Sequence, residues 1–505
     1  MKKITLFLGV SVCLFATSCD KGFDELNTNK TAATTVNPAF LLNNAIINAS
    51  FPSPILWYDM SIVQQTVTPN SGVLTGANFN QDNRDYTQQI WLRYYPDVIR
   101  NTKTTIDLAS KDPQRSNLFN MTRIWQAHAF MVLTDTYGDI PYFDAGVGFI
   151  NQVVLPKYDP QEAIYKDIIK ELKEASAALD ASKAKENADI LYAGDITKWK
   201  KLGYSLLLRA GMRLTAVDPT LAQQTVKDAV QGGLMESNAD NAVVRHNANY
   251  TNALGSTLNG TEGNNIYLGG PFVSYLKSTS DPRLKSIAVR YVGATSGPQQ
   301  IPANASTDPA VQIGMPFGFD NITIIPQATK DGLASFYAYS QIDRTRLAKQ
   351  QSPMFLVTYG MNQLLLAEAA QRGWVVGAAE EYYKKGVRAH MEQMALYDAN
   401  AAIPNSAIDA YLTANPYNAS KALEQINTQY WIATFMNGPE TFANWRRSNF
   451  PKLTPNPFPG KSIKGDFINR LTYPNSEVSV NKTNVDEAKA RMGDDNLDTK
   501  VWWDK

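Results

Sequence analysis

Cysteine is almost absent from this chain of 505 residues: the two cysteines, Cys13 and Cys19, both precede residue 20. A disulfide framework after that point is excluded, because no later thiol exists to form one. Histidine is nearly as scarce, and His128, His246 and His390 form no cluster with the spacing of a zinc site. The sequence also lacks HExxH and GxSxG. It therefore offers no signature of a metalloprotease or a serine hydrolase.

An excess of charge of one sign is missing too. Lys and Arg number 48 and Asp and Glu 47, without a long run of either sign, so the chain has no electrostatic footprint for nucleic acid. The stretch "PGKS" resembles the end of a phosphate-binding loop, but Pro455 replaces the first glycine and no strand pattern precedes it. Beyond the N-terminal stretch, no run of 18 uncharged apolar residues predicts a membrane span.

The N-terminal residues have the pattern of an export signal. Two lysines follow Met1, an apolar run covers residues 4–16, and small residues precede Cys19 in "FATSC". This last stretch resembles a bacterial lipobox, in which the cysteine is acylated and becomes the first residue after cleavage. We therefore predict a signal peptide at residues 1–18 and a lipid anchor on Cys19. The alternative is an ordinary signal peptide with an incidental cysteine.

Most of the remaining chain has helical periodicity. In "DPQEAIYKDIIKELKEASAALD", Asp159 is the expected N-cap, Pro160 the first helical residue, and Glu162 the partner in a capping box. Apolar residues recur there at spacings of three and four: Ile164, Ile168, Leu172, Ala175 and Leu179. Similar segments arrive in pairs, and "KWKKLGY" repeats the opening of a tetratricopeptide unit. The predicted fold is mostly α, a tetratricopeptide-like scaffold of helical hairpins.

Two long segments lack this period, chiefly residues 68–88 and 246–352. They are rich in Gly, Asn, Thr, Ser and aromatic residues. Loops of this length are usually functional or disordered, and the aromatic content favours order. We expect a single domain over residues 19–505, with a loop-rich part inserted at about 246–352.

The stretch "TDTYGDIPYFDA" raises the question of a reaction centre, because it carries three carboxylates: Asp135, Asp139 and Asp144. Helix termination explains the same residues. The helix is expected to end at about Tyr137, Gly138 supplies a left-handed residue, and Pro141 prevents the helix from resuming. We favour the turn. A glycosidase built from two carboxylates stays open as an alternative, because such a pair need not be close in sequence.

Seven motifs occur in order after the N-terminal signal: "YGDIPY", "PKYDPQEAIYKDIIKEL", "DILYAGDITKWKKLGYSLLLRAGMR", "DPRL", "LLLAEAAQRGW", "FANWRRSNFPKL" and "RLTYPNSEVSVN". In this order they resemble the SusD/RagB family, in particular its SusD-like branch. The resemblance implies a lipid-anchored protein on the outer-membrane surface that binds nutrients and delivers them to a SusC-like TonB-dependent transporter. It implies binding without catalysis. We expect no cofactor and assign no residue to a metal site.

These motifs belong to the scaffold, so the ligand site has to be inferred from chemistry. A glycan needs exposed aromatic rings for its C–H faces and polar side chains for its hydroxyls, both on loops. The candidates are Asn78, Asn80, Tyr86, Asn264, Asn265, Tyr267, Phe336, Tyr337 and Tyr339. Ordinary loop packing is the alternative for each. Trp91, Tyr95 and Ile99 instead have helical spacing, which predicts a core stripe. The expected ligand is an oligosaccharide, and a peptide is the second possibility.

Overall fold

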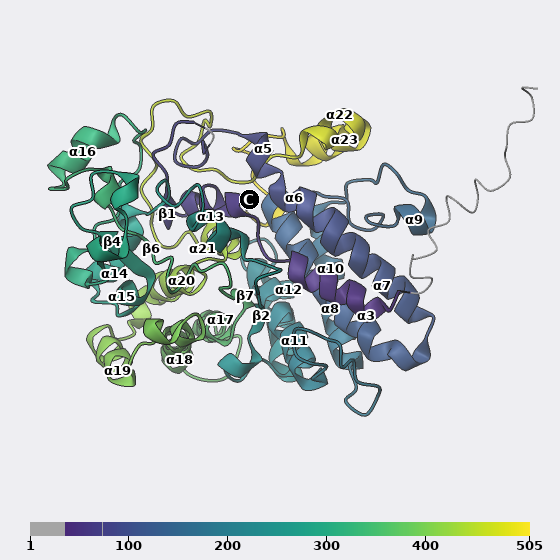
Figure 1. Cartoon of the computed structure of the whole chain (residues 1–505). Coiled ribbons are helices and arrows are strands. Elements are labelled where there is room, and N and C mark those ends of the chain that lie inside the picture. Colours follow the sequence, from purple (N-terminus) through teal and green to yellow (C-terminus); the bar gives the residue numbers. More distant parts are fainter. Residues whose placement is uncertain (1–35, 73, 505) are drawn as a thin grey trace, which may run out of the picture. The chain divides into compact units, whose positions relative to one another are not determined.

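The computed structural model describes residues 36–72 and 74–504, apart from the side chain of residue 149 (Figure 1). The described residues from 38 onward form one compact unit. The predicted signal peptide and Cys19 lie outside the described residues. Within the described part of the chain, no helix combines the length and apolar character that crossing a bilayer requires.

Helices that pack against one another in pairs form the scaffold of the molecule (Figure 1). The principal contacts join α3 (Pro38–Asn48) to α7 (Arg100–Ser110), α7 to α8 (Ser116–Tyr137), α8 to α10 (Gln161–Ala178), α10 to α11 (Ile196–Arg213), α11 to α12 (Pro219–Gly232), α17 (Tyr359–Gln371) to α18 (Ala379–Gln393) and to α20 (Ala422–Ala433), and α20 to α21 (Gly438–Ser448). The prediction of a mostly helical fold with paired helices is confirmed.

The start of α10 differs from its predicted capping. The helix begins at Gln161 with Pro160 in the N-cap position. The Asp159 carboxylate instead accepts hydrogen bonds from the backbone N–H groups of Tyr142 and Phe143. The N–H of Gln161 donates to Asp139 Oδ1 at 3.0 Å, so the cap comes from the loop after α8. The predicted capping box is wrong, because a distant carboxylate satisfies the first amide of the helix.

Further α-helices, most of them short, lie among the loops; one falls in the predicted aperiodic segment 68–88 and four fall in the segment 246–352. The remaining α-helices are α4 (Asp59–Ile62), α5 (Arg84–Thr87), α6 (Gln89–Arg93), α9 (Gly148–Asn151), α13 (Ala253–Leu258), α14 (Gly270–Ser278), α15 (Arg283–Ile287), α16 (Ile324–Lys330), α19 (Asn405–Ala414), α22 (Asn475–Val480) and α23 (Lys482–Met492). Residues 246–352 therefore have more regular structure than their composition suggests. Their helices α13 to α16 are too short for a periodic pattern to be visible.

The strands are short and antiparallel. β1 (Thr66–Val67) pairs with β3 (Tyr267–Leu268), and β2 (Ala242–Val244) pairs with β7 (Met354–Val357). In a third sheet, β4 (Ala288–Tyr291) lies between β5 (Ala305–Ser306) and β6 (Gln341–Ile342). Each strand has two to four residues, so the sheets tie loops to one another and do not form a layer of their own.

Trp91 belongs to the core, as its spacing predicts. It is 5% exposed and surrounded by tyrosine rings. Their centroids lie 4.6 to 5.9 Å from that of Trp91, and the rings belong to Tyr95, Tyr137, Tyr158 and Tyr473. The expected continuous α-helix is interrupted, because residues Tyr94–Ile99 form a π-helix that contains Pro96. A proline has no N–H to donate, and a wider turn accommodates it.

Buried ion pairs connect the helices. Arg447 on α21 makes two hydrogen bonds with Glu368 on α17, at 2.8 and 2.7 Å, and both side chains are 1% exposed. Arg213 on α11 donates to Glu440 on α21 at 2.7 Å and lies 3.2 Å from Asp135 on α8. Helix backbones satisfy their own polar groups, so the side chains can connect one helix to another.

Candidate ligand-binding site

The stretch "TDTYGDIPYFDA" forms a helix end. α8 ends at Tyr137, and Gly138 has a φ of 83° and donates its N–H to Thr134 O. Burial raises the pKa of both Asp135 and Asp139. Asp135 accepts hydrogen bonds from the Tyr165 hydroxyl and the Trp503 indole, and Asp139 accepts from Arg491 Nε at 3.0 Å. Since these carboxylates hold neighbouring elements together, the geometry favours the turn over a catalytic pair.

A hollow of about 430 Å³ opens among the loops, and we call it the Tyr86 hollow. Three parts of the chain form its walls: the turn Ser53–Leu56, the helices α5 and α6, and α13 with the loop that follows. The lining residues are Pro52, Ser53, Pro54, Trp57, Leu74, Tyr86, Gln89, Arg93, Ala253, Thr257, Thr261 and Glu262. Aromatic, aliphatic and hydrogen-bonding side chains thus meet in one place.

Local structure fixes the ring of Tyr86 in this hollow. Asn83 caps α5 by accepting a hydrogen bond from the Asp85 N–H. The half-buried Tyr86 ring meets the buried Trp57 ring edge to face, at a centroid distance of 5.2 Å and an angle of 85°. Burial raises the pKa of Tyr86, and the charges of Glu262 and Asp85 raise it further. The phenol therefore stays neutral at pH 7 and can donate a hydrogen bond.

The polar side chains of the Tyr86 hollow are held by neighbouring groups. Glu262 accepts from Asn265 Nδ2 at 2.8 Å. Gln89 donates to the Asp85 carbonyl at 2.6 Å, and Arg93 donates to the Ser50 carbonyl at 3.1 Å. A carboxylate, an amide and a guanidinium around an accessible tyrosine ring suit a ligand that has both hydroxyl groups and apolar C–H faces.

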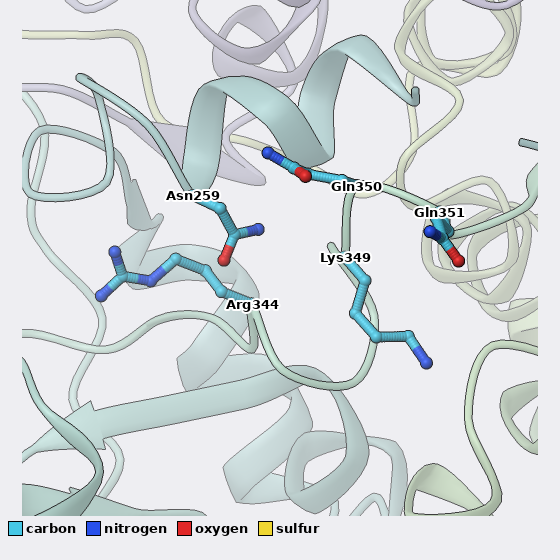
Figure 2. A pocket seen from close by; sticks show the side chains of 5 residues that line it. All are labelled: Asn259, Arg344, Lys349, Gln350 and Gln351. Carbon is cyan, nitrogen blue, oxygen red and sulfur yellow. The ribbon is translucent and has the colours of Figure 1, made fainter. Parts of the chain in front are cut away.

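A second hollow of about 570 Å³ lies next to the same loop, and we call it the Arg344 hollow. Figure 2 shows Asn259 and Arg344 on one side, and Lys349, Gln350 and Gln351 along the segment opposite. Asn259 directly follows α13, and the neighbouring Thr257 and Thr261 line the Tyr86 hollow. The end of α13 and its following loop therefore separate the two hollows.

The structure buries three of the predicted ligand contacts, and their role in binding stays a prediction. Tyr267 is completely buried on β3, and its hydroxyl donates to the Asn264 carbonyl at 2.6 Å. Tyr339 is completely buried, with its hydroxyl 2.6 Å from Asp331. Asn78 is 1% exposed and donates to two backbone carbonyls, at 2.6 and 3.0 Å. A ligand cannot reach these groups while the loops keep this arrangement. Asn80 is buried as well.

The other predicted residues have different surroundings. Tyr86 lines its hollow. Asn265 lies next to the hollow, because its side chain donates to Glu262, which lines it. Phe336 and Tyr337 are half-buried and stack on each other with centroids 4.3 Å apart, but neither lines either hollow. Their role in binding stays a prediction. The structure thus brings Tyr86 and Asn265 together and leaves the Phe336–Tyr337 pair elsewhere on the loops.

Sequence reasoning missed the residues of the Arg344 hollow. Four of its five lining residues come from "RTRLAKQQ", residues 344–351. One signal could have indicated these residues: long polar side chains are concentrated at the end of the segment 246–352, which is otherwise rich in small residues. In the described residues, no group of three His, Cys, Asp or Glu side chains is arranged to hold a metal ion.

Paired helices hold the loops that carry the two hollows. This is the arrangement of a ligand-binding protein built on a helical scaffold. A family model described as "Starch-binding associating with outer membrane" matches residues 28–474. The chain therefore belongs to the SusD-like family. No protein among the curated sequences matches it.

Solved structures agree with this assignment. A chitin-binding protein shares 33% identity and a TM-score of 0.82, over 93% of this chain and 100% of that one. A SusD-like protein described as Bacteroidetes AC2a shares 26% identity with a TM-score of 0.79, over 93% and 100%. A chitin-binding SusD homolog from Flavobacterium johnsoniae, at 24% identity and a TM-score of 0.75 over 93% and 98%, shares the fold.

Proposed function

We propose that this protein captures oligosaccharides at the outer-membrane surface through the Tyr86 hollow and delivers them to a SusC-like TonB-dependent transporter. The observation that carries the proposal is the accessible Tyr86 ring, held against Trp57 and surrounded by Glu262, Gln89 and Arg93. Membership of a family described as starch-binding supports a glycan as the ligand. We propose binding without catalysis, because the carboxylates of the suspected reaction centre hold the scaffold together.

Chito-oligosaccharides are the first probes to use, because a relative with 33% identity is described as chitin-binding. Malto-oligosaccharides follow, since the family description names starch. The experiment is calorimetric titration of the full-length protein, purified in detergent, with a panel of both. A peptide panel under the same conditions tests the second ligand class. Release of shortened sugars during incubation would indicate a glycosidase.

Replacing Tyr86 with Ala is expected to weaken oligosaccharide binding by about 1–3 kcal/mol, as truncation of an aromatic contact residue does. The melting temperature should change little, because the ring is half exposed. Tyr382→Ala on α18 is the matched control: this tyrosine is also half-buried and lines neither hollow. If Tyr86→Ala binds as tightly as the unaltered protein, the Tyr86 hollow is not the glycan site.

The lipid anchor can be tested separately. Cys19→Ala should leave the folded unit intact and release the protein from the membrane fraction, because the acyl chains supply the membrane affinity. The measurement is sedimentation with outer membranes in cells that lack the transporter. A variant that still sediments there would contradict the anchor proposal.

A further inference from the structure

The Arg344 hollow differs from the Tyr86 hollow in charge. The Tyr86 hollow contains the carboxylate of Glu262 beside Arg93. Among the residues that the structure describes, no carboxylate lines the Arg344 hollow, whose side chains are three amides and two cations: Asn259, Gln350, Gln351, Arg344 and Lys349. Arg344, Lys349, Gln350 and Gln351 have donors for a ligand, whereas Asn259 Nδ2 already donates to the carbonyls of Gly255 and Ala348 at 2.8 and 2.7 Å and leaves its amide oxygen as an acceptor. The two hollows thus offer different chemistry on either side of one loop.

Neutral acceptors hold the guanidinium of Arg344. Its Nη2 donates to the Tyr291 hydroxyl at 3.0 Å and lies 3.4 Å from Gln341 Oε1, while Nη1 lies 3.3 Å from the Leu258 carbonyl. The guanidinium also lies over the Tyr291 ring, 5.4 Å from its centroid. In the described chain no carboxylate forms an ion pair with Arg344. The contrast is Arg346, which pairs with Asp343 at 2.6 Å.

The backbone of the shared loop leaves room for this arginine. A Cβ atom at Gly263 would lie 2.3 Å from Arg344 Nη1 and 2.8 Å from the Leu258 carbonyl oxygen, so a larger residue there would displace the guanidinium. Leu258 is the last residue of α13, whose neighbours Thr257 and Thr261 line the Tyr86 hollow. Arg344 is therefore fixed to the wall that the two hollows share.

Lys349 lies across the hollow from Arg344, and Figure 2 shows its ammonium directed away from the Arg344 guanidinium. It pairs with Asp398 at 2.7 Å, and its side chain is 40% exposed. Asp398 thus partly neutralises the charge of Lys349, whereas Arg344 supplies a positive charge without a carboxylate partner among the described residues. A charge-assisted hydrogen bond from a guanidinium to an anion is about twice as strong as one to a neutral acceptor.

We infer that the Arg344 hollow binds an anionic substituent, a carboxylate or a sulfate, of a glycan held at the Tyr86 hollow. The ligand class is then an acidic oligosaccharide. This inference rests on the proposed function, and it adds a charge requirement that a starch or chitin chain does not meet. Asn259, Gln350 and Gln351 would bind the neighbouring hydroxyl groups.

The test compares matched ligands that differ in charge alone, with the full-length protein in detergent. One pair is an oligogalacturonide and its carboxyl-reduced neutral form, and the other is a chondroitin sulfate oligosaccharide and its desulfated form. The protein should bind at least one charged member about tenfold more tightly than its neutral partner, and added salt should reduce this difference. The pair that responds identifies carboxylate or sulfate. Equal affinity within both pairs would overturn the inference.

Arg344→Gln should abolish this tenfold preference, so that the charged and neutral forms bind with equal affinity. Arg290→Gln is the matched control, because Arg290 is also held by carbonyl oxygens, those of Ala338 and Val311, outside the hollow. If Arg344→Gln melts at a lower temperature, two further variants distinguish a loss of charge from a loss of folding. Lys349→Gln should reduce the preference for the charged ligand, and Arg344→Lys should keep part of it. A preference that survives in Arg344→Gln would refute the assignment.

The same titrations distinguish this inference from the proposed function. Binding of neutral glycans that depends on Tyr86, without any preference for charge, would retain the function and remove the anionic site. A charge preference that Arg344→Gln abolishes and Tyr86→Ala leaves untouched would retain the anionic site and move the glycan out of the Tyr86 hollow. Absence of binding to every glycan would overturn both.

Discussion

The helical scaffold and the loop-rich segment 246–352 each contain a buried ion pair, but the backbone around the pairs differs. In the scaffold, Arg447 pairs with Glu368 across two helices. In the loop-rich segment, Arg283 pairs with Asp281, two residues away, and other side chains hold loop carbonyls: Gln341 donates to Gly263 and Ile266, and Arg290 donates to Ala338 and Val311. Helix interiors satisfy their own backbone groups, whereas loops leave carbonyls that side chains have to satisfy. The Gln341 amide is therefore structural.

The aromatic residues of the two regions differ as well. Trp91 in the scaffold is buried, as its helical spacing predicts, although the rings of Tyr137, Tyr158 and Tyr473 around it come from distant segments. In the loops, Tyr86 is accessible and Tyr267 is completely buried, although both lie in segments of similar composition. Burial in the loops follows from contacts between distant segments, such as the pairing of Tyr267 with Val67.

Breaking the scaffold should have the largest effect. Trp91→Ala is expected to lower the free energy of unfolding by about 3–5 kcal/mol, because it leaves a cavity among four tyrosine rings. Folded protein should keep its affinity for the ligand, since Trp91 lines neither hollow. Urea denaturation and glycan titration measure the two effects. A stable Trp91→Ala protein that no longer binds would place the ligand site on the helices of the scaffold and not on the loops.

The buried ion pair of the scaffold gives the next effect. Glu368→Gln should cost about 3 kcal/mol at pH 7, because it leaves the Arg447 guanidinium buried without its counter-ion. Lys166→Ala, which removes the exposed partner of Glu162, is the control and should cost less than about 1 kcal/mol. Thermal and urea denaturation test both. Equal losses in the two variants would contradict a special role for the buried pair.

The same carboxylate predicts a dependence on pH. Burial alone would raise the pKa of Glu368, but Arg447 and Arg372 lower it to about 2, below the ordinary value of 4.5. A lowered pKa in the folded state means that the stabilisation is complete above pH 4.5 and is lost as the pH falls towards 2. Glu368→Gln should lack this part of the acid dependence, which denaturation at a series of pH values would show.

A loop anchor should give the smallest effect on stability. Gln341→Leu removes the donor to the carbonyls of Gly263 and Ile266, and it should cost about 1–3 kcal/mol because buried acceptors lose their partner. It should also weaken glycan binding, since the loop 259–265 forms the wall between the two hollows. Loss of binding at an unchanged melting temperature would mean that the amide contacts the ligand directly.

Only part of the site could be predicted from the sequence. Tyr86, predicted from its place in a polar, aromatic loop, lines a hollow, whereas Tyr267 and Tyr339, predicted by the same reasoning, are buried. Composition cannot tell an accessible ring from a buried one, because residues packed around Tyr267, such as Val67 on β1, lie far away in the sequence. Arg344 was missed for a related reason: its surroundings come from α13, β4 and β6.

The sequence by itself determined the helices, the turn at Gly138, the core position of Trp91 and the membership of the family. These features depend on local periodicity and on short motifs, which are present in the sequence whatever the tertiary contacts are. The tertiary structure alone decided that Asp139 caps α10, that Tyr267 is buried while Tyr86 is accessible, and that Arg344 lies against Gly263. Each of these depends on segments that meet only when the helices pack, because burial and hydrogen bonding at a loop residue are set by whatever the fold places beside it.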